Sequence, residues 1–167
     1  MSLIKKLLNK PDTSISNVYY SRGSQKPSEP APLQDKRIIM DIAGLYYHIK
    51  ELHKAGTVNR MYYLKDEDLI ATGKKKVFRF RFDKPMTLEE EPTNKHDPNA
   101  IKILIDGFHV GYVPAEFCVM VKKAMANNAI TDIQYNIKGG EYKYIENNSV
   151  YEEENDYTSS VIISYKG

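Results

Sequence analysis

The residues with the clearest potential for chemistry lie in a short polar turn, residues 93–100, between two apolar stretches. Asn94, Asp97 and Asn99 can each hydrogen-bond to the nearby backbone, and Pro98 has a fixed φ. Two uses of such a turn stay open. It is either a stiff connection between strands or a rigid support that presents amide, imidazole and carboxylate groups to a ligand.

Catalysis finds little support in the sequence. The four histidines and the single cysteine, Cys118, do not follow a metal-ligand spacing such as CxxC or HExxH. His96 and Asp97 are the one tempting acid–base pair, but neighbours in sequence do not easily reach the geometry that a base and its orienting group need. The run Glu89–Glu91 is typical of a solvated strand edge. We therefore expect no enzymatic activity, no cofactor and no bound metal.

The composition bounds the class of protein. The chain has 167 residues, 41% of them hydrophobic, and a net charge of +2, so any site for a polyanion must be a local patch. Residues 1–36 are polar and rich in Pro and Ser, which predicts a flexible N-terminal tail before a domain over 37–167. One cysteine excludes an internal disulfide, and no apolar run is long enough for a bilayer. We expect a cytoplasmic protein without a membrane partner.

Strands must position the polar turn. Residues 37–49 predict a first strand with a bulge at Gly44, and residues 74–82 predict one continuous strand with three phenylalanines facing the core. Residues 86–92 predict the next strand. The alternation of Ile101, Ile103 and Ile105 before Asp106–Gly107 predicts a hairpin whose return strand holds Val110 and Tyr112.

The remaining segments complete the expected architecture. Residues 48–54 predict a short helix ending at Gly56, and residues 114–128 predict a second helix in which Cys118 is a buried structural thiol. Residues 61–73 are ambiguous and are taken as a loop with a strand or turn fragment. Two further strands, 133–144 with a sharp bend at its Gly-Gly pair and 159–165, would be joined by an acidic loop, 147–157. The tally of about six strands and two short helices predicts a mainly β (α+β) fold, a small antiparallel barrel.

One string gives a more specific expectation. The pattern E-P-x-N-x-x-D-P-N-A-I-K-[IV], a short hairpin, V-G-Y-V-P and a helix resembles the HIRAN domain family, which includes stand-alone bacterial and phage proteins. The resemblance implies an OB-like β-barrel with two helices that binds DNA. In eukaryotic members the domain grips the 3′ end of a single strand. Zinc binding and hydrolase activity linked to the family would belong to fused domains that this chain lacks.

The resemblance also implies roles for individual residues. By motif, Tyr47 on the first strand and His96 in the turn would stack on bases, and Asp97, beside Asn94, would accept from the terminal 3′-hydroxyl. Tyr46 occupies the position of a basic residue, and residues 49–75 form an insertion. Phosphate contacts would come from Lys74, Lys75, Lys76, Arg79, Arg81, Lys95 or Lys102. The expected DNA-binding residues are Tyr46, Tyr47, Lys74, Lys76, Arg79, Asn94, Lys95, His96, Asp97 and Tyr112.

Two functions remain open from the sequence. The first is a nucleic-acid-binding module for single-stranded DNA or DNA 3′ ends in repair, replication or processing, with a helicase or nuclease as a possible partner. The alternative is a protein-interaction module on the same barrel that has lost DNA binding, which the acidic segment Glu152–Asp156 and the near-neutral net charge favour.

Overall fold

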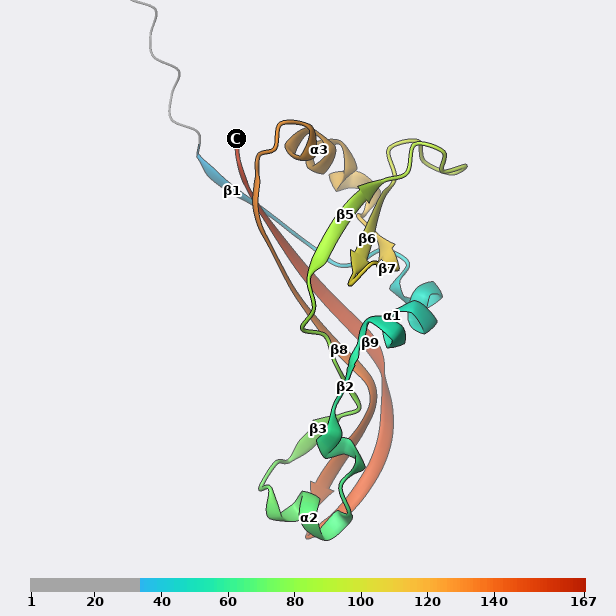
Figure 1. Cartoon of the computed structure of the whole chain (residues 1–167), viewed down its shortest axis with the longest axis vertical. Coiled ribbons are helices and arrows are strands. Elements are labelled where there is room, and N and C mark those ends of the chain that lie inside the picture. Colours follow the sequence, from blue (N-terminus) through green and yellow to red (C-terminus); the bar gives the residue numbers. More distant parts are fainter. Residues whose placement is uncertain (1–33) are drawn as a thin grey trace, which may run out of the picture. The chain divides into compact units, whose positions relative to one another are not determined.

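The structure is a computed structural model that describes residues 34–167 (Figure 1). Most of the tail predicted over residues 1–36 lies outside the described residues. The fold is mainly β with antiparallel sheets, as predicted, and it is consistent with an OB-like fold. Within residues 34–167 the backbone forms nine strands, three α-helices and two 3₁₀ helices, which is more than the predicted six strands and two helices.

The largest sheet has the strand order β1-β9-β8-β3. Its centre is a long hairpin of β8 (Ile130–Glu146) and β9 (Ser149–Lys166). β1 (Asp35–Met40) pairs with the second half of β9, whereas β3 (Lys76–Phe78) pairs with β8 near the hairpin turn. The two ends of the β8–β9 hairpin, which we call the ribbon, therefore belong to different parts of the fold.

The predicted acidic loop over residues 147–157 is wrong. Asn147 and Asn148 alone make the turn, with φ values of 49° and 61°, the left-handed conformation that a two-residue hairpin turn requires. Glu152–Asp156 lie within β9, and Glu152–Asn155 pair with β8, because strand pairing satisfies backbone groups whatever the charge of the side chains. At Gly139–Gly140, where the sequence predicted a sharp bend, the register between β8 and β9 shifts while β8 continues as one strand.

A second sheet, β5-β6-β7, carries the polar turn. β5 (Met86–Glu90) pairs with β6 (Ile101–Ile105), and β6 pairs with β7 (Phe108–Tyr112). The predicted hairpin is confirmed, since Asp106 and Gly107 adopt φ values of 51° and 81° between the last two strands.

The continuous strand predicted over residues 74–82 is wrong. It is divided at Arg79 into β3 and β4 (Phe80–Arg81), and β4 pairs with β2 (Thr57–Val58). At Arg79 the backbone N–H donates to Glu141, while the carbonyl accepts from Asn59, so the chain changes partner at this residue. The three phenylalanines of the segment are half-buried, and alternation alone could not show that two sheets share them.

Two segments that were predicted as a strand and as a loop are partly helical. After β1 the left-handed Gly44 (φ 73°) leads into the 3₁₀ helix η1 (Leu45–His48), so the predicted first strand ends early. Residues 61–73 contain η2 (Arg60–Tyr63) and α2 (Asp66–Ala71), in place of the expected loop. η2 and α2 are both too short for a helical period to be visible in their sequence. Three acidic residues in the first turn of α2 favour its helix, because they face the positive end of its dipole.

Two helices were predicted and are confirmed. α1 (Ile49–Ala55) ends at Gly56, and α3 (Ala115–Ala126) begins after Pro114. Gly56 is not left-handed as a C′ glycine would be. A side chain there would meet Phe80 at 3.0 Å, so close packing explains the glycine. Among residues 34–167, no helix is both long and apolar enough to cross a membrane.

The buried side chains form two clusters. The main core joins β1, α1, α3, the β5-β6-β7 sheet and the β1-paired half of the ribbon. A satellite core consists of Tyr62 of η2, Leu69 of α2 and Val77 of β3. α2 and β3 lie at the turn end of the ribbon (Figure 1). The insertion over residues 49–75 therefore supplies α1 to the main core and builds the satellite core.

Candidate nucleic-acid interface

The polar turn is held rigid by its own side chains. The Oδ1 atom of Asn94 accepts from the backbone N–H groups of His96 (2.9 Å) and Asp97 (3.2 Å). Oδ1 of Asp97 accepts from the N–H of Asn99 at 2.8 Å. These bonds confirm the stiff turn expected from Asn94 and Asp97, while Asn99 contributes through its backbone N–H.

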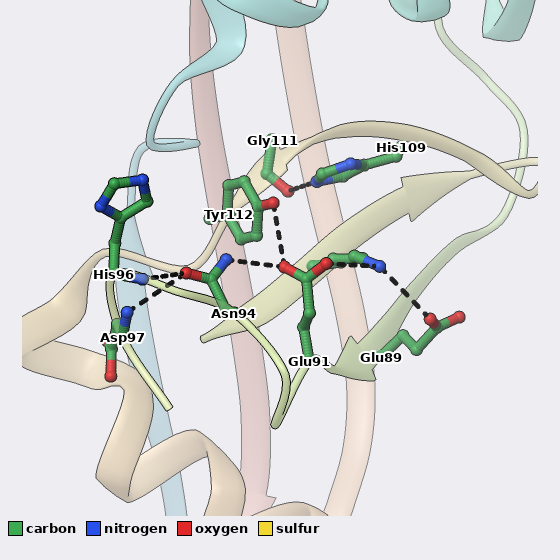
Figure 2. A network of polar contacts seen from close by, with 9 residues as sticks. Glu89, Glu91, Asn94, His96, Asp97, His109, Gly111 and Tyr112 are labelled. Atoms are coloured by element: carbon green, nitrogen blue, oxygen red, sulfur yellow. Dashed lines mark hydrogen bonds and ion pairs between the residues drawn. The ribbon is translucent and has the colours of Figure 1, made fainter. Parts of the chain in front are cut away.

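Glu91 connects the turn to the sheet (Figure 2). Its Oε2 atom accepts from Nδ2 of Asn94 at 2.7 Å and from the hydroxyl of Tyr112 at 3.0 Å. Its Oε1 atom lies 2.9 Å from Nζ of Lys102 on β6. One carboxylate thus fixes the turn, an aromatic ring and a lysine at once.

The electrostatics follow from these contacts. The hydrogen bond from Asn94, then those from Lys102 and Tyr112, hold the pKa of Glu91 at about 2. Burial, and then the bond to Glu91, raise the pKa of the Tyr112 hydroxyl, which stays a donor at neutral pH. The bond to Glu91 likewise raises the pKa of Lys102.

Glu91 itself was missed by the sequence reasoning, which took Glu89–Glu91 as a solvated edge. The signal that could have found it is the E-P-x-N pattern, because a glutamate three residues before the turn asparagine can reach its amide.

The turn and the end of β7 line an open hollow of about 270 Å³. Asp97 keeps one carboxylate oxygen, Oδ2, without a hydrogen-bond partner among residues 34–167. The imidazole of His96 is exposed, and His96 and Tyr112 both line this hollow. The hollow is lined by Asn94, His96, Asp97, Ala100, Tyr112, Val113 and Ala115.

Tyr46 and Tyr47 are not on a strand but on η1, which corrects the expected first-strand position. Their side chains are 76% and 85% exposed, and their ring centroids lie 5.9 Å apart at an angle of 80°. The pair of backbone hydrogen bonds between Ala43 and Tyr112, both 2.9 Å, ties the segment before η1 to the end of β7. Two exposed rings are thereby anchored beside the strand that carries Tyr112.

The two tyrosines of η1 border different surroundings. Tyr46 lines a second hollow, of about 480 Å³, together with Glu154 and Asp156. Those carboxylates repel phosphate, so Tyr46 is the less suitable of the two rings for contact with a polyanion. Tyr47 lines neither hollow and stands free for stacking.

Histidines join η1 to the hollow. The ring centroids of His48 and His109 lie 4.2 Å apart, and that of His109 lies 4.6 Å from Tyr112 with the rings nearly perpendicular. Nε2 of His109 is 3.0 Å from the carbonyl oxygen of Gly111. Burial, and then the charge of His48, lower the pKa of His109, with a smaller contribution from Lys102 in the same direction. Neither histidine was singled out from the sequence.

The expected basic residues are only partly brought together. Lys95 is exposed on the turn, whereas Lys102 on β6 is bound to Glu91. Arg79 binds Glu141 and Tyr63, and Lys76 lies over the ring of Tyr142 at 3.6 Å, so both belong to the turn end of the ribbon. Lys74 precedes β3 in the same region, and none of these three lines the hollow.

The fold and this surface define a small, mainly β binding module with exposed aromatic rings beside a rigid polar turn. The model of one family, the HIRAN domain, matches residues 37–155, and the chain therefore belongs to the HIRAN domain family. No curated protein and no solved structure matches the chain. Family membership makes it a DNA-binding, nucleic-acid-recognition module in general.

Proposed function

We propose that the chain binds single-stranded DNA at a free 3′ end, without catalysis. The observation that carries the proposal is the Asp97 carboxylate, one oxygen of which has no protein partner among residues 34–167, beside the hollow. A carboxylate repels phosphate but accepts readily from a hydroxyl. A terminal sugar is the part of a DNA strand that offers a 3′-hydroxyl without a phosphate.

The neighbouring groups suit the rest of such a strand end. Tyr47 offers an exposed face for a base, and stacking on an aromatic side chain contributes about 1–3 kcal/mol per base with little sequence preference. His96, exposed on the turn, would stack on a second base, and Lys95 on the same turn is an exposed cation for a phosphate. Asn94 and Glu91 position these groups without contacting DNA themselves.

The proposal is tested by fluorescence anisotropy with strands that end in a 3′-hydroxyl or a 3′-phosphate. We expect the hydroxyl to bind at least tenfold tighter, and the affinity to fall with rising salt. The Asp97→Asn variant should lose most of this discrimination, since an amide accepts less strongly from the hydroxyl and no longer repels phosphate. Equal affinity of the native chain for both ends would contradict 3′-end recognition.

A module of this kind would act in DNA repair, replication or processing in the cytoplasm and would bring a helicase or nuclease partner to a strand end. It would itself need neither a cofactor nor a metal. The test is whether the purified chain changes a labelled strand. Cleavage or unwinding by the native chain that is lost in Asp97→Ala would contradict a purely binding role.

The alternative is a protein-interaction module that has lost DNA binding. The observation that favours it is the acidic hollow formed by Tyr46, Ile49, Glu154, Asp156 and their neighbours, which suits a cationic side chain better than a phosphate. Absence of measurable DNA affinity, together with a partner captured equally by the native chain and by Asp97→Ala, would support this alternative.

A further inference from the structure

The turn end of the long ribbon carries a row of aromatic side chains on one face. β3 pairs with β8 so that Lys76 faces Tyr144 and Phe78 faces Tyr142, and Tyr144 in turn faces Tyr151 on β9. Because side chains directly opposite in antiparallel strands point to the same side, these residues share a face. We call it the tyrosine face, consisting of Lys76, Phe78, Tyr142, Tyr144, Tyr151 and Glu153.

The opposite face of the same strands is covered. Val77 lies on that side and joins Tyr62 and Leu69 in the satellite core, against which Ile145 and Val150 pack. The helices of the insertion therefore cover one side of the ribbon. On the tyrosine face, Tyr151 is 45% exposed and Lys76 is exposed, and Tyr144 and Phe78 are half-buried. Tyr142, with Nζ of Lys76 over its ring, is buried, so Tyr144 and Tyr151 are the tyrosines that a ligand can reach.

The rings of the tyrosine face are held in a fixed row. Successive ring centroids, from Phe78 through Tyr142 and Tyr144 to Tyr151, lie 5.5, 6.1 and 5.1 Å apart. The last pair is stacked, with 21° between the ring planes. Glu153 accepts from the hydroxyl of Tyr142 at 2.6 Å, which fixes the centre of the row. Aromatic rings held in place in this way lose little entropy when a base stacks on them.

The charges around this end of the ribbon are separated between the two faces. Glu141 binds Arg79 and Glu152 binds Tyr62, both on the covered side. Lys74–Lys76 form no ion pair with any residue of 34–167, and Nζ of Lys76 lies over Tyr142. The acids on the open side are Glu153, which is engaged by tyrosines, and Glu146 beside the hairpin turn. The face thus combines flat rings with a lysine run at its edge.

We propose that the tyrosine face is a second surface for single-stranded DNA, on which bases stack against Tyr144 and Tyr151 while Lys74–Lys76 contact the phosphates. Aromatic rings beside a basic strand edge are the combination that binds single strands without sequence preference. The inference rests on the proposed function in taking single-stranded DNA as the ligand. It uses none of the residues that line the hollow beside Asp97.

The test compares a short strand of about four nucleotides with a long strand of about 30, both ending in a 3′-hydroxyl, by fluorescence anisotropy; single OB folds cover about 4–16 nucleotides. In the double variant Tyr144→Ala/Tyr151→Ala we expect the long strand to bind about tenfold more weakly and the short strand to bind as before. Tyr63→Ala is the matched control, because Tyr63 is a 59% exposed tyrosine of η2 outside the tyrosine face.

A second variant guards against loss of folding. Lys74→Glu/Lys75→Glu/Lys76→Glu changes exposed side chains and should weaken the long strand and reduce its salt dependence. Unchanged long-strand affinity in both variants would overturn the proposal, and so would an equal loss for short and long strands in a folded variant. If the long strand weakens as expected but 3′-hydroxyl and 3′-phosphate ends bind alike, the tyrosine face stands and the end-recognition proposal fails.

Discussion

The hydroxyl of Tyr112 donates to Oε2 of Glu91 across 3.0 Å, and the same oxygen accepts from the amide of Asn94 at 2.7 Å. An aromatic side chain of β7 and the polar turn after β5 are therefore fixed by one carboxylate. Because neither can shift without breaking a charge-assisted hydrogen bond, the shape of the hollow depends on Glu91.

Replacing Glu91 should weaken DNA binding without removing any group that contacts DNA. In Glu91→Ala the turn and Tyr112 lose their common acceptor, and we expect about a tenfold loss of affinity, equivalent to about 1.4 kcal/mol. Glu91→Gln keeps one acceptor oxygen and should lose less. Anisotropy titrations of both variants check this, and equal affinity of Glu91→Ala and the native chain would show that the network does not position the site.

The same carboxylate should give stability an acid dependence. The pKa of Glu91 is about 2 in the folded chain, against an ordinary value of 4.5. A depressed pKa contributes stability that is fully present above the unfolded value and is lost as the pH falls toward the folded one. Urea unfolding between pH 5 and 2 should therefore show a smaller decrease of the midpoint in Glu91→Gln than in the native chain. Parallel curves would contradict this.

A histidine should make stability depend on pH in a higher range than Glu91 does. The pKa of His109 is lowered by burial and by His48, so the folded chain favours the neutral ring. Its contribution is present above about pH 6.5, the ordinary histidine value, and is lost as the pH falls below it. His109→Asn should reduce the change of the urea-unfolding midpoint between pH 7 and 5. His53→Asn is the control, because His53 lies against Phe80 and Tyr157, away from this pair.

Tyr47 allows binding to be separated from stability. Its ring is 85% exposed, so Tyr47→Ala should change the free energy of unfolding by less than about 0.5 kcal/mol. Loss of one stacked base should nevertheless weaken DNA binding by about 1–3 kcal/mol. Tyr46→Ala, next to the acidic hollow, should weaken binding less. A larger effect from Tyr46 than from Tyr47 would place the strand on the other side of η1.

Much of the fold followed from local patterns. The alternation of isoleucines in β6, the Asp106–Gly107 turn and the helix after Pro114 were all predicted, because each is determined by residues next to one another in sequence. The change of partner at Arg79 was not, since it depends on Glu141 and Asn59, which are remote in the chain. The length of β9 was missed because its first half is acidic and shows no apolar alternation. It nevertheless pairs with β8 on both sides of the bulge.

The candidate site divides in the same way. Asn94 and Asp97 were recognised because their bonds stay within the turn. Glu91 reaches Tyr112, and His48 reaches His109, only after β5, β7 and η1 have come together. Lys76 and Arg79 were grouped with the turn on charge alone, although the fold places them at the far end of the ribbon.

Gly111 should be a sensitive glycine for both the fold and the site. Its φ is 150°, and a Cβ atom there would lie 2.4 Å from Cγ2 of Ile42 and 2.7 Å from the carbonyl oxygen of Ala43. Gly111→Ala should therefore push β7 away from the segment before η1 and break the Ala43–Tyr112 bridge, at a cost of about 3 kcal/mol or more.

Gly107→Ala is the matched control, because its φ is 81° but nothing lies within 4 Å of the added atom. It should cost about 1–2 kcal/mol, the strain of the left-handed backbone alone. Urea unfolding and DNA titration of the two variants measure the difference; similar losses of stability would show that backbone strain, and not the contact with Ala43, requires glycine in the V-G-Y-V-P motif.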